Sequence, residues 1–195
     1  MGPIGHCSVG MAVKRFAPRV PLGILLLAGF FLDLLAISFG YLGIEGTPAT
    51  GDPWSHGLFM SVCWSAAAGF LCRRIFRSLH AGVVVGLVVF SHWILDLISH
   101  PIPFASFSFR TWQWDYGHPL PADLHLLFRS SPVVGFGLYN HIGAVQATVL
   151  EMAMFLAGAA LYIDYRVRKR EKTASSPAAH SASRSAGAGR ANRIR

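Results

Sequence analysis

The residues of this chain that could do chemistry are histidines and aspartates set in apolar sequence. The segment SHWILDLISH contains His92, Asp96 and His100 at positions i, i+4 and i+8. In a helix these three side chains share one face, with about 6 Å of rise between successive members. An imidazole and a carboxylate one turn apart can bind the same divalent ion, as paired helical ligands do in bundle metal sites. The spacing therefore favours a metal site.

The elements that must position these residues are apolar enough to cross a membrane. Hydrophobic residues make up 53% of the chain and charged residues 13%, whereas about a quarter of a soluble domain is charged. Four apolar blocks, at residues 20–42, 56–72, 79–99 and 133–163, approach the roughly 20 residues that a spanning helix needs. These features predict an all-α polytopic membrane protein, a four-span helical bundle. Residues 1–170 form its transmembrane domain, with an N-terminal half-helix near residues 4–13, and residues 171–195 form a disordered basic tail.

The basic residues are distributed in a way that predicts orientation. Of the 17 Lys and Arg, only Arg110 and Arg129 lie outside the segments before the first block, between the second and third, and after the fourth. The positive-inside rule then predicts a multi-pass protein of the cytoplasmic (inner) membrane with both termini in the cytoplasm. Membrane lipid is the expected partner. A nucleic acid is not expected, because this topogenic bias explains the high pI.

Counting residues along the helices from the two basic turns brings the polar residues to one level. At 1.5 Å per residue, five side chains rise roughly 20 to 30 Å from the cytoplasmic surface: His6, Asp33, His56, His92 and Asp96. The inclusion of His6 requires that its segment be a half-helix returning into the protein. The sequence therefore predicts a constellation in the outer half of the membrane that binds zinc or a similar divalent ion.

Some of the polar residues could have a structural role instead of a role in the metal site. His141, beside Asn140, enters from the outer end of the fourth block, but a lone His in a span also serves as a hydrogen-bonding partner between helices. His100 is equally suited to capping the end of its helix, and His56 to an interfacial turn before a helix.

The acidic residues differ in how readily they can be explained without a site. Glu151 lies too far toward the cytoplasm to join the constellation and is interpreted as a structural acid. Asp33 and Asp96 are harder to explain structurally, since a carboxylate facing lipid would be neutralised or expelled.

Four motifs resemble those of one known family. GHCSVG at the start, FLDLL in the first block, WSHGLF at the head of the second and SHWILDLISHP in the third are similar to motifs of the YdjM-like membrane-bound metal-dependent hydrolases, also described as LexA-binding inner-membrane hydrolases. A later stretch, SSPVVGFGLYNHIGAVQATVLEMAMF, looks like the last span of some members, so the likeness covers about residues 4–165. The resemblance implies metal ligands or acid–base groups at the following positions: His6, Asp33, His56, His92 and Asp96, with His100, Asn140 and Glu151 as secondary candidates.

The chain departs from the family pattern at two places. Many members carry a DxDH motif where this chain has Leu-Asp-Leu-Leu around Asp33, and the HRG before the second histidine motif is missing. Fewer carboxylates argue against a second metal ion.

Two functions follow as expectations. As an enzyme, the protein would bind a divalent ion, zinc in the first instance, through His6, His56, His92 and Asp96, and Asp33 would accept a proton from the activated water. The substrate would then be a lipid-like molecule or a phosphoester. The alternative is a non-enzymatic membrane protein whose buried His and Asp handle ions or protons or hold helices together.

Overall fold

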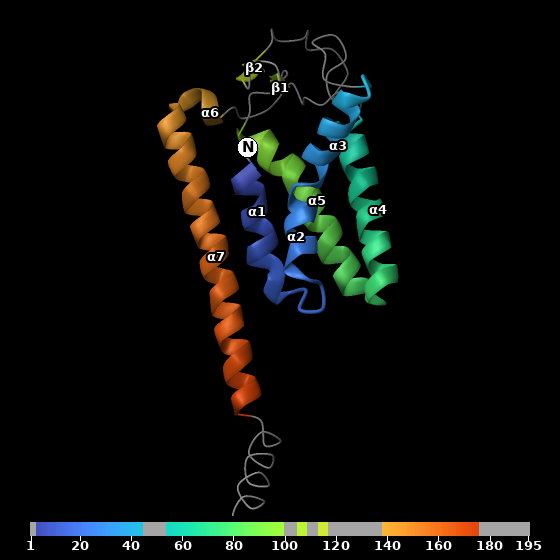
Figure 1. Ribbon diagram of the computed structural model, residues 1–195, viewed down its shortest axis with the longest axis vertical. Coiled ribbons are helices and arrows are strands. Elements are labelled where there is room, and N and C mark those ends of the chain that lie inside the picture. Colours follow the sequence, from blue (N-terminus) through green and yellow to red (C-terminus); the bar gives the residue numbers. More distant parts are fainter. Residues whose placement is uncertain (1–2, 45–53, 100–104, 109–112, 117–137, 176–195) are drawn as a thin grey trace, which may run out of the picture.

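Helices dominate the structure. The computed structural model describes residues 3–44, 54–99, 105–108, 113–116 and 138–175. In chain order the elements are α1 (Pro3–Ala12), the 3-10 turn η1 (Val13–Arg15), α2 (Leu22–Gly29), α3 (Phe31–Tyr41), α4 (Leu58–Phe76), α5 (Leu79–Ser99), β1 (Ala105–Ser108), β2 (Gln113–Tyr116), α6 (Leu138–His141) and α7 (Ala144–Ala174). The two short strands pair antiparallel, with Ala105 opposite Tyr116. Figure 1 shows the helices as a bundle with α7 on its outside.

Apolar helices are present in all four blocks, but the fourth block, expected over residues 133–163, contains the short α6 and then α7, which begins only at Ala144. Helices α4, α5 and α7 are each long and apolar enough to cross a membrane, and α2 with α3 would make a fourth span if the pair counts as one. The fold is thus compatible with a membrane protein. The first apolar block differs from the continuous helix expected for it, because α2 and α3 meet at a bend of 57° around Phe30.

Glycines allow neighbouring helices to approach closely. A Cβ on Gly82 of α5 would lie 2.5 Å from the carbonyl oxygen of Gly69 on α4, and a Cβ on Gly69 would lie 2.8 Å from the Gly82 carbonyl oxygen. Such contacts exclude a side chain at either position, as is usual where small residues bring helices together. They fix α4 and α5 as a tight hairpin (Figure 1).

One face of α5 is buried at helical spacing. The stripe of Val84, Val85, Val88 and Val89 continues without interruption to His92. Residues at these intervals lie on one side of a helix, so the apolar packing of the stripe also turns His92 into the bundle.

The predicted N-terminal half-helix is confirmed as α1. It packs between α2 and α7, where Cβ atoms added to Gly10 and Gly158 would lie 2.5 Å from the carbonyl oxygens of Leu25 and Ser8 respectively. Helix α1 ends next to the basic residues Lys14 and Arg15. Because it is only 10 residues long, about 15 Å, its first residue lies part-way along the bundle.

The basic segments gather at one end of the bundle. The buried Lys14 donates to the carbonyl oxygens of Ala17, Pro18 and Val20. Burial lowers the pKa of Lys14, and repulsion from Lys169 and Arg166 on α7 lowers it further. The loop after α1 and the C-terminal part of α7 therefore lie together.

Helices α1 and α7 run side by side in the same direction (Figure 1). The expectation that both termini lie in the cytoplasm stays a prediction. One sequence prediction needs correction here. Helix α7 continues to Ala174, four residues into the segment expected to be disordered, through helix-favouring Arg, Lys and Glu residues. Residues 176–195 lie outside the described part of the chain.

Candidate metal centre

The break between α2 and α3 creates the first part of the site. Helix α2 ends at Gly29, and α3 begins two residues later with Asp33 in its first turn. The exposed N–H groups at a helix N-terminus favour a negative charge, so the start of α3 stabilises the Asp33 carboxylate. The end of α2, in turn, leaves carbonyl oxygens without partners inside the helix.

One of those carbonyls orients His92. The side chain of His92 is completely buried, and its Nδ1 lies 2.8 Å from the Gly29 carbonyl oxygen. A carbonyl oxygen only accepts hydrogen bonds, so Nδ1 carries the proton and donates it. Nε2 is then the atom that His92 turns toward the two carboxylates, and in the neutral ring it carries a lone pair. Metal-binding histidines are commonly held in this way by a second hydrogen bond.

His56 reaches the same point from the turn before α4. The indole Nε1 of Trp64 donates to the Trp54 carbonyl oxygen at 2.7 Å, which ties this turn to the helix that follows it. Ser55 Oγ lies 2.9 Å from His56 Nδ1. His56 Nε2 therefore points inward and lies 3.2 Å from His92 Nε2.

The two carboxylates each reach both imidazoles. Asp33 Oδ1 lies 3.4 Å from His92 Nε2 and 3.5 Å from His56 Nε2. Asp96 Oδ2, one turn after His92 on α5, lies 3.2 Å from His92 Nε2 and 3.7 Å from His56 Nε2. A tetrahedral ion with bonds of about 2.0–2.1 Å holds its donors about 3.3–3.4 Å apart. These separations thus match the edges of a tetrahedral coordination shell.

The arrangement needs positive charge between its members. Asp33 and Asp96 have 23% and 16% of their side chains exposed, so water screens them little. Two carboxylates and two imidazole nitrogens directed at one point repel one another unless protons or a cation lie between them. A divalent ion supplies that charge at a single position.

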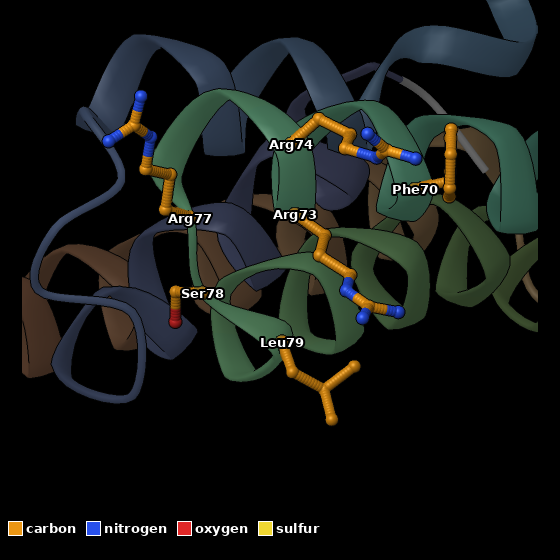
Figure 2. A pocket seen from close by; sticks show the side chains of 6 residues that line it. All are labelled: Phe70, Arg73, Arg74, Arg77, Ser78 and Leu79. Atoms are coloured by element: carbon orange, nitrogen blue, oxygen red, sulfur yellow. The ribbon is translucent and has the colours of Figure 1, made fainter.

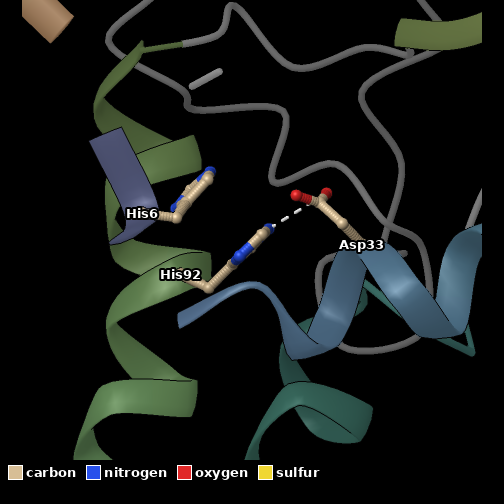
Figure 3. A group of neighbouring side chains, drawn as sticks. All are labelled: His6, Asp33 and His92. Carbon is tan, nitrogen blue, oxygen red and sulfur yellow. Dashed lines mark ion pairs between the residues drawn. The ribbon is translucent and has the colours of Figure 1, made fainter. Parts of the chain in front are cut away.

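His6 completes the cluster in a different way. Its buried ring stacks on that of His92, with centroids 3.6 Å apart and planes 9° apart, and its Nε2 lies 3.3 Å from Asp96 Oδ1. Asp96 therefore uses one oxygen toward His6 and the other toward His56 and His92. Figure 3 shows His6, His92 and Asp33 brought together from α1, α5 and α3.

Two overlapping groups of donor atoms could hold a metal ion. One comprises His6, Asp33 and His92, and the other His56, His92 and Asp96, with the donor atoms of each group within 4.8 Å of one another. The predicted convergence of the five residues is confirmed. Their separate roles as ligand or base stay predictions.

The secondary candidates are not members of the two donor groups. His141 was expected at the depth of the cluster, but it is exposed in α6 and belongs to neither donor group. Glu151 is half-buried on α7 and also belongs to neither group, and its interpretation as a structural acid stays a prediction. The side chain of Asn140 and all of His100 lie outside the described residues.

Two supporting residues were not anticipated. Gly29 contributes its carbonyl to His92, and a Cβ on Gly29 would lie 2.6 Å from the His6 carbonyl oxygen. Ser55 contacts His56. A glycine in the middle of an apolar block is a sequence signal for a helix break, and a hydroxyl next to His56 is a signal for a side-chain partner. Comparisons of this chain with protein-family models, with curated proteins and with solved structures give no match.

Proposed function

We propose that this protein is a membrane-embedded, metal-dependent hydrolase that uses a single divalent ion, zinc in the first instance. The observation that carries the proposal is the spacing of the donor atoms. The Nε2 atoms of His56 and His92 and the carboxylates of Asp33 and Asp96 lie 3.2–3.7 Å apart in every pair given above. This is the separation that a tetrahedral ion imposes on its ligands.

The geometry supports a division of roles among the five residues. His56, His92 and Asp96 would hold the ion, since they form one of the two donor groups and His92 and Asp96 lie one turn apart on α5. His6 would position Asp96, because it contacts the carboxylate oxygen turned away from the other two imidazoles. Three protein ligands leave a tetrahedral ion one position for water, as in catalytic zinc sites.

Asp33 is the proposed proton acceptor. A bound divalent ion would supply a water molecule acidic enough to lose a proton near neutral pH. The Asp33 carboxylate sits at the N-terminus of α3, where the helix favours its charged form, and it is the most exposed acid of the cluster. It is therefore suited to taking the proton and releasing it to the leaving group.

The proposed substrate is a lipid-like molecule or a phosphoester carried by one. The cluster lies among helices that are apolar enough for a membrane, so a substrate must reach it along apolar surface. On α3, the helix that carries Asp33, the rings of Phe31 and Phe39 lie 6.3 Å and 6.4 Å from that of Trp64 on α4. Aromatic rings beside a polar cluster suit the junction between an acyl chain and a head group.

The motif resemblance supports the same proposal. GHCSVG, FLDLL, WSHGLF and SHWILDLISHP contain six His and Asp residues that resemble those of YdjM-like hydrolases. Five of them are the members of the cluster, and the sixth, His100, lies outside the described residues. We place the protein in the inner membrane on the charge pattern, with the basic end of the bundle in the cytoplasm and the cluster in the outer half.

One observation favours the non-enzymatic alternative. Asp33 Oδ1 is as close to the two imidazoles as Asp96 Oδ2 is, so Asp33 can serve as a fourth ligand. A shell closed by four protein ligands is typical of structural zinc sites. In that case the ion would hold α3, α4 and α5 together and catalyse nothing.

Metal analysis of the detergent-purified protein tests the proposal. The wild-type protein should retain about one equivalent of zinc after dialysis, and His92→Ala and Asp96→Ala should each abolish stoichiometric binding, because one lost ligand leaves an incomplete shell. His141→Ala removes an exposed imidazole outside the cluster and should retain the metal. Glu151→Gln should retain it too. Unchanged metal content in folded His92→Ala and Asp96→Ala would eliminate the metal site and the hydrolase with it.

A further inference from the structure

The loop between α4 and α5 forms a basic cavity that the metal centre does not use. Six residues from the end of α4 and the start of α5 line a cavity of about 610 Å³: Phe70, Arg73, Arg74, Arg77, Ser78 and Leu79. Figure 2 shows these side chains spread along the end of the helix hairpin. The end of α4 and the start of α5 meet at one end of the helix hairpin (Figure 1), whereas His92 and Asp96 lie in the second half of α5.

The three arginines have no acidic partner among the residues that the structure describes. The ion pair between Arg168 and Asp164 joins two residues of α7 and does not involve these arginines. Arginine stays charged under all ordinary conditions, so three guanidinium groups around one cavity repel one another and attract an anion.

Arg77 is held in an unfavourable backbone conformation. Its φ of 47° and ψ of 40° place it in the left-handed region at the C-cap of α4, where glycine is the usual residue. An arginine at that position gives up backbone stability that a glycine would keep. In exchange, Arg77 adds a positive charge to the cavity, which a glycine would not.

The surroundings of the cavity are apolar. Phe70, Leu71, Ile75 and Leu79 each have more than half of their side chain exposed, and the Arg74 guanidinium lies 5.0 Å from the centre of the Phe70 ring. Charged groups bordered by exposed apolar side chains at the end of apolar helices match a phospholipid, whose phosphate adjoins its acyl chains.

We infer that this cavity binds the head group of an anionic glycerophospholipid, with the acyl chains along the exposed apolar faces of α4 and α5. Arg73, Arg74 and Arg77 provide the charge and hydrogen-bond donors that a phosphate takes up. The inference rests on the placement of the helices in a membrane and is independent of the metal centre.

Native mass spectrometry of the detergent-purified full-length chain tests this inference. Phosphatidylglycerol and phosphatidylcholine with identical acyl chains are supplied in equal amounts, and retention of each is measured. Each arginine near an anionic head group contributes roughly fivefold in affinity, so the wild-type protein should favour phosphatidylglycerol by at least roughly tenfold. The triple variant Arg73→Gln, Arg74→Gln, Arg77→Gln should lose that preference.

A matched triple variant on α7 removes the same charge from the same end. Arg166→Gln, Lys169→Gln, Arg170→Gln should keep the preference to within about twofold, since these residues lie outside the cavity. Equal losses in both triple variants would show that net charge alone attracts the lipid, and would overturn the site. Equal retention of the two lipids by the wild-type protein would overturn it too, and so would displacement of the lipid by inorganic phosphate.

Arg77→Gly separates lipid binding from folding. Glycine relieves the left-handed conformation, so the thermal midpoint should rise while phosphatidylglycerol retention falls roughly fivefold. A rise in the midpoint with unchanged retention would remove Arg77 from the site.

Discussion

The imidazole of His92 donates from Nδ1 to the carbonyl oxygen of Gly29, 2.8 Å away, across the packed helices α5 and α2. This bond exists because α2 ends at Gly29 and leaves that carbonyl unused by its own helix. It fixes which nitrogen of His92 faces the two aspartates. A break in one apolar helix thus prepares a ligand on another.

Gly29→Ala tests this relationship. The new Cβ would lie 2.6 Å from the His6 carbonyl oxygen, so α1 and α2 must separate. We expect the free energy of unfolding to fall by about 1–3 kcal/mol and metal affinity to fall about 10–100-fold, measured by denaturation and by competition with a chelator. Gly23→Ala in the same helix is the control, because nothing lies within 4 Å of its Cβ and it should leave metal affinity unchanged. Equal effects of the two substitutions would contradict the role of Gly29.

His6→Ala distinguishes a positioning residue from a ligand. His6 contacts Asp96 Oδ1, whereas His56 and His92 face Oδ2. Loss of a residue that orients a ligand typically weakens metal binding about 10–100-fold without abolishing it. Titration with zinc should therefore show weakened, still stoichiometric binding in His6→Ala and no stoichiometric binding in His92→Ala. Identical loss in both variants would make His6 a ligand.

Asp33→Asn separates the enzyme from the structural protein. As the proton acceptor, Asp33 is dispensable for metal binding, so the variant should keep its zinc and lose hydrolysis of a phosphoester lipid. As a fourth ligand, it should lose the zinc as well. Metal content measured beside turnover decides between the two, and the wild-type protein must show turnover for the hydrolase proposal to stand.

Acidification should release the metal. His56 and His92 bind an ion only when Nε2 is unprotonated, so protons compete with the ion for both imidazoles. Affinity should therefore be highest at alkaline pH and fall continuously as the pH drops. Zinc titrations at a series of pH values should show affinity falling by up to about two powers of ten per pH unit, as expected for two competing protons. Affinity that does not change with pH would exclude imidazole ligands.

The orientation of the bundle can be read with reporter fusions. The basic residues that the structure describes lie toward one end of the bundle, and the positive-inside rule predicts that this end is in the cytoplasm. A reporter fused after Lys172 should be active in the cytoplasm, and one inserted at Gly51 should be active outside. The reverse result would invert the proposed topology and move the His and Asp cluster to the inner half of the membrane.

Much of the site could be predicted from the sequence because helices have a fixed rise and period. The i, i+4 spacing of His92 and Asp96 determines that they share a face, and counting from the basic turns brought His6, Asp33 and His56 to the same level. The apolar composition of the blocks determined that these elements would be helices compatible with a membrane.

Only the tertiary structure decided how the side chains meet. The bend at Phe30 and the Gly29 carbonyl depend on the close packing of α1 against α2, which the apolar pattern of either segment does not contain. The sequence also did not decide that His141 would be exposed in α6, outside both donor groups. Helical spacing is a property of one segment, whereas the approach of two helices depends on the glycines of both and on what each must bury.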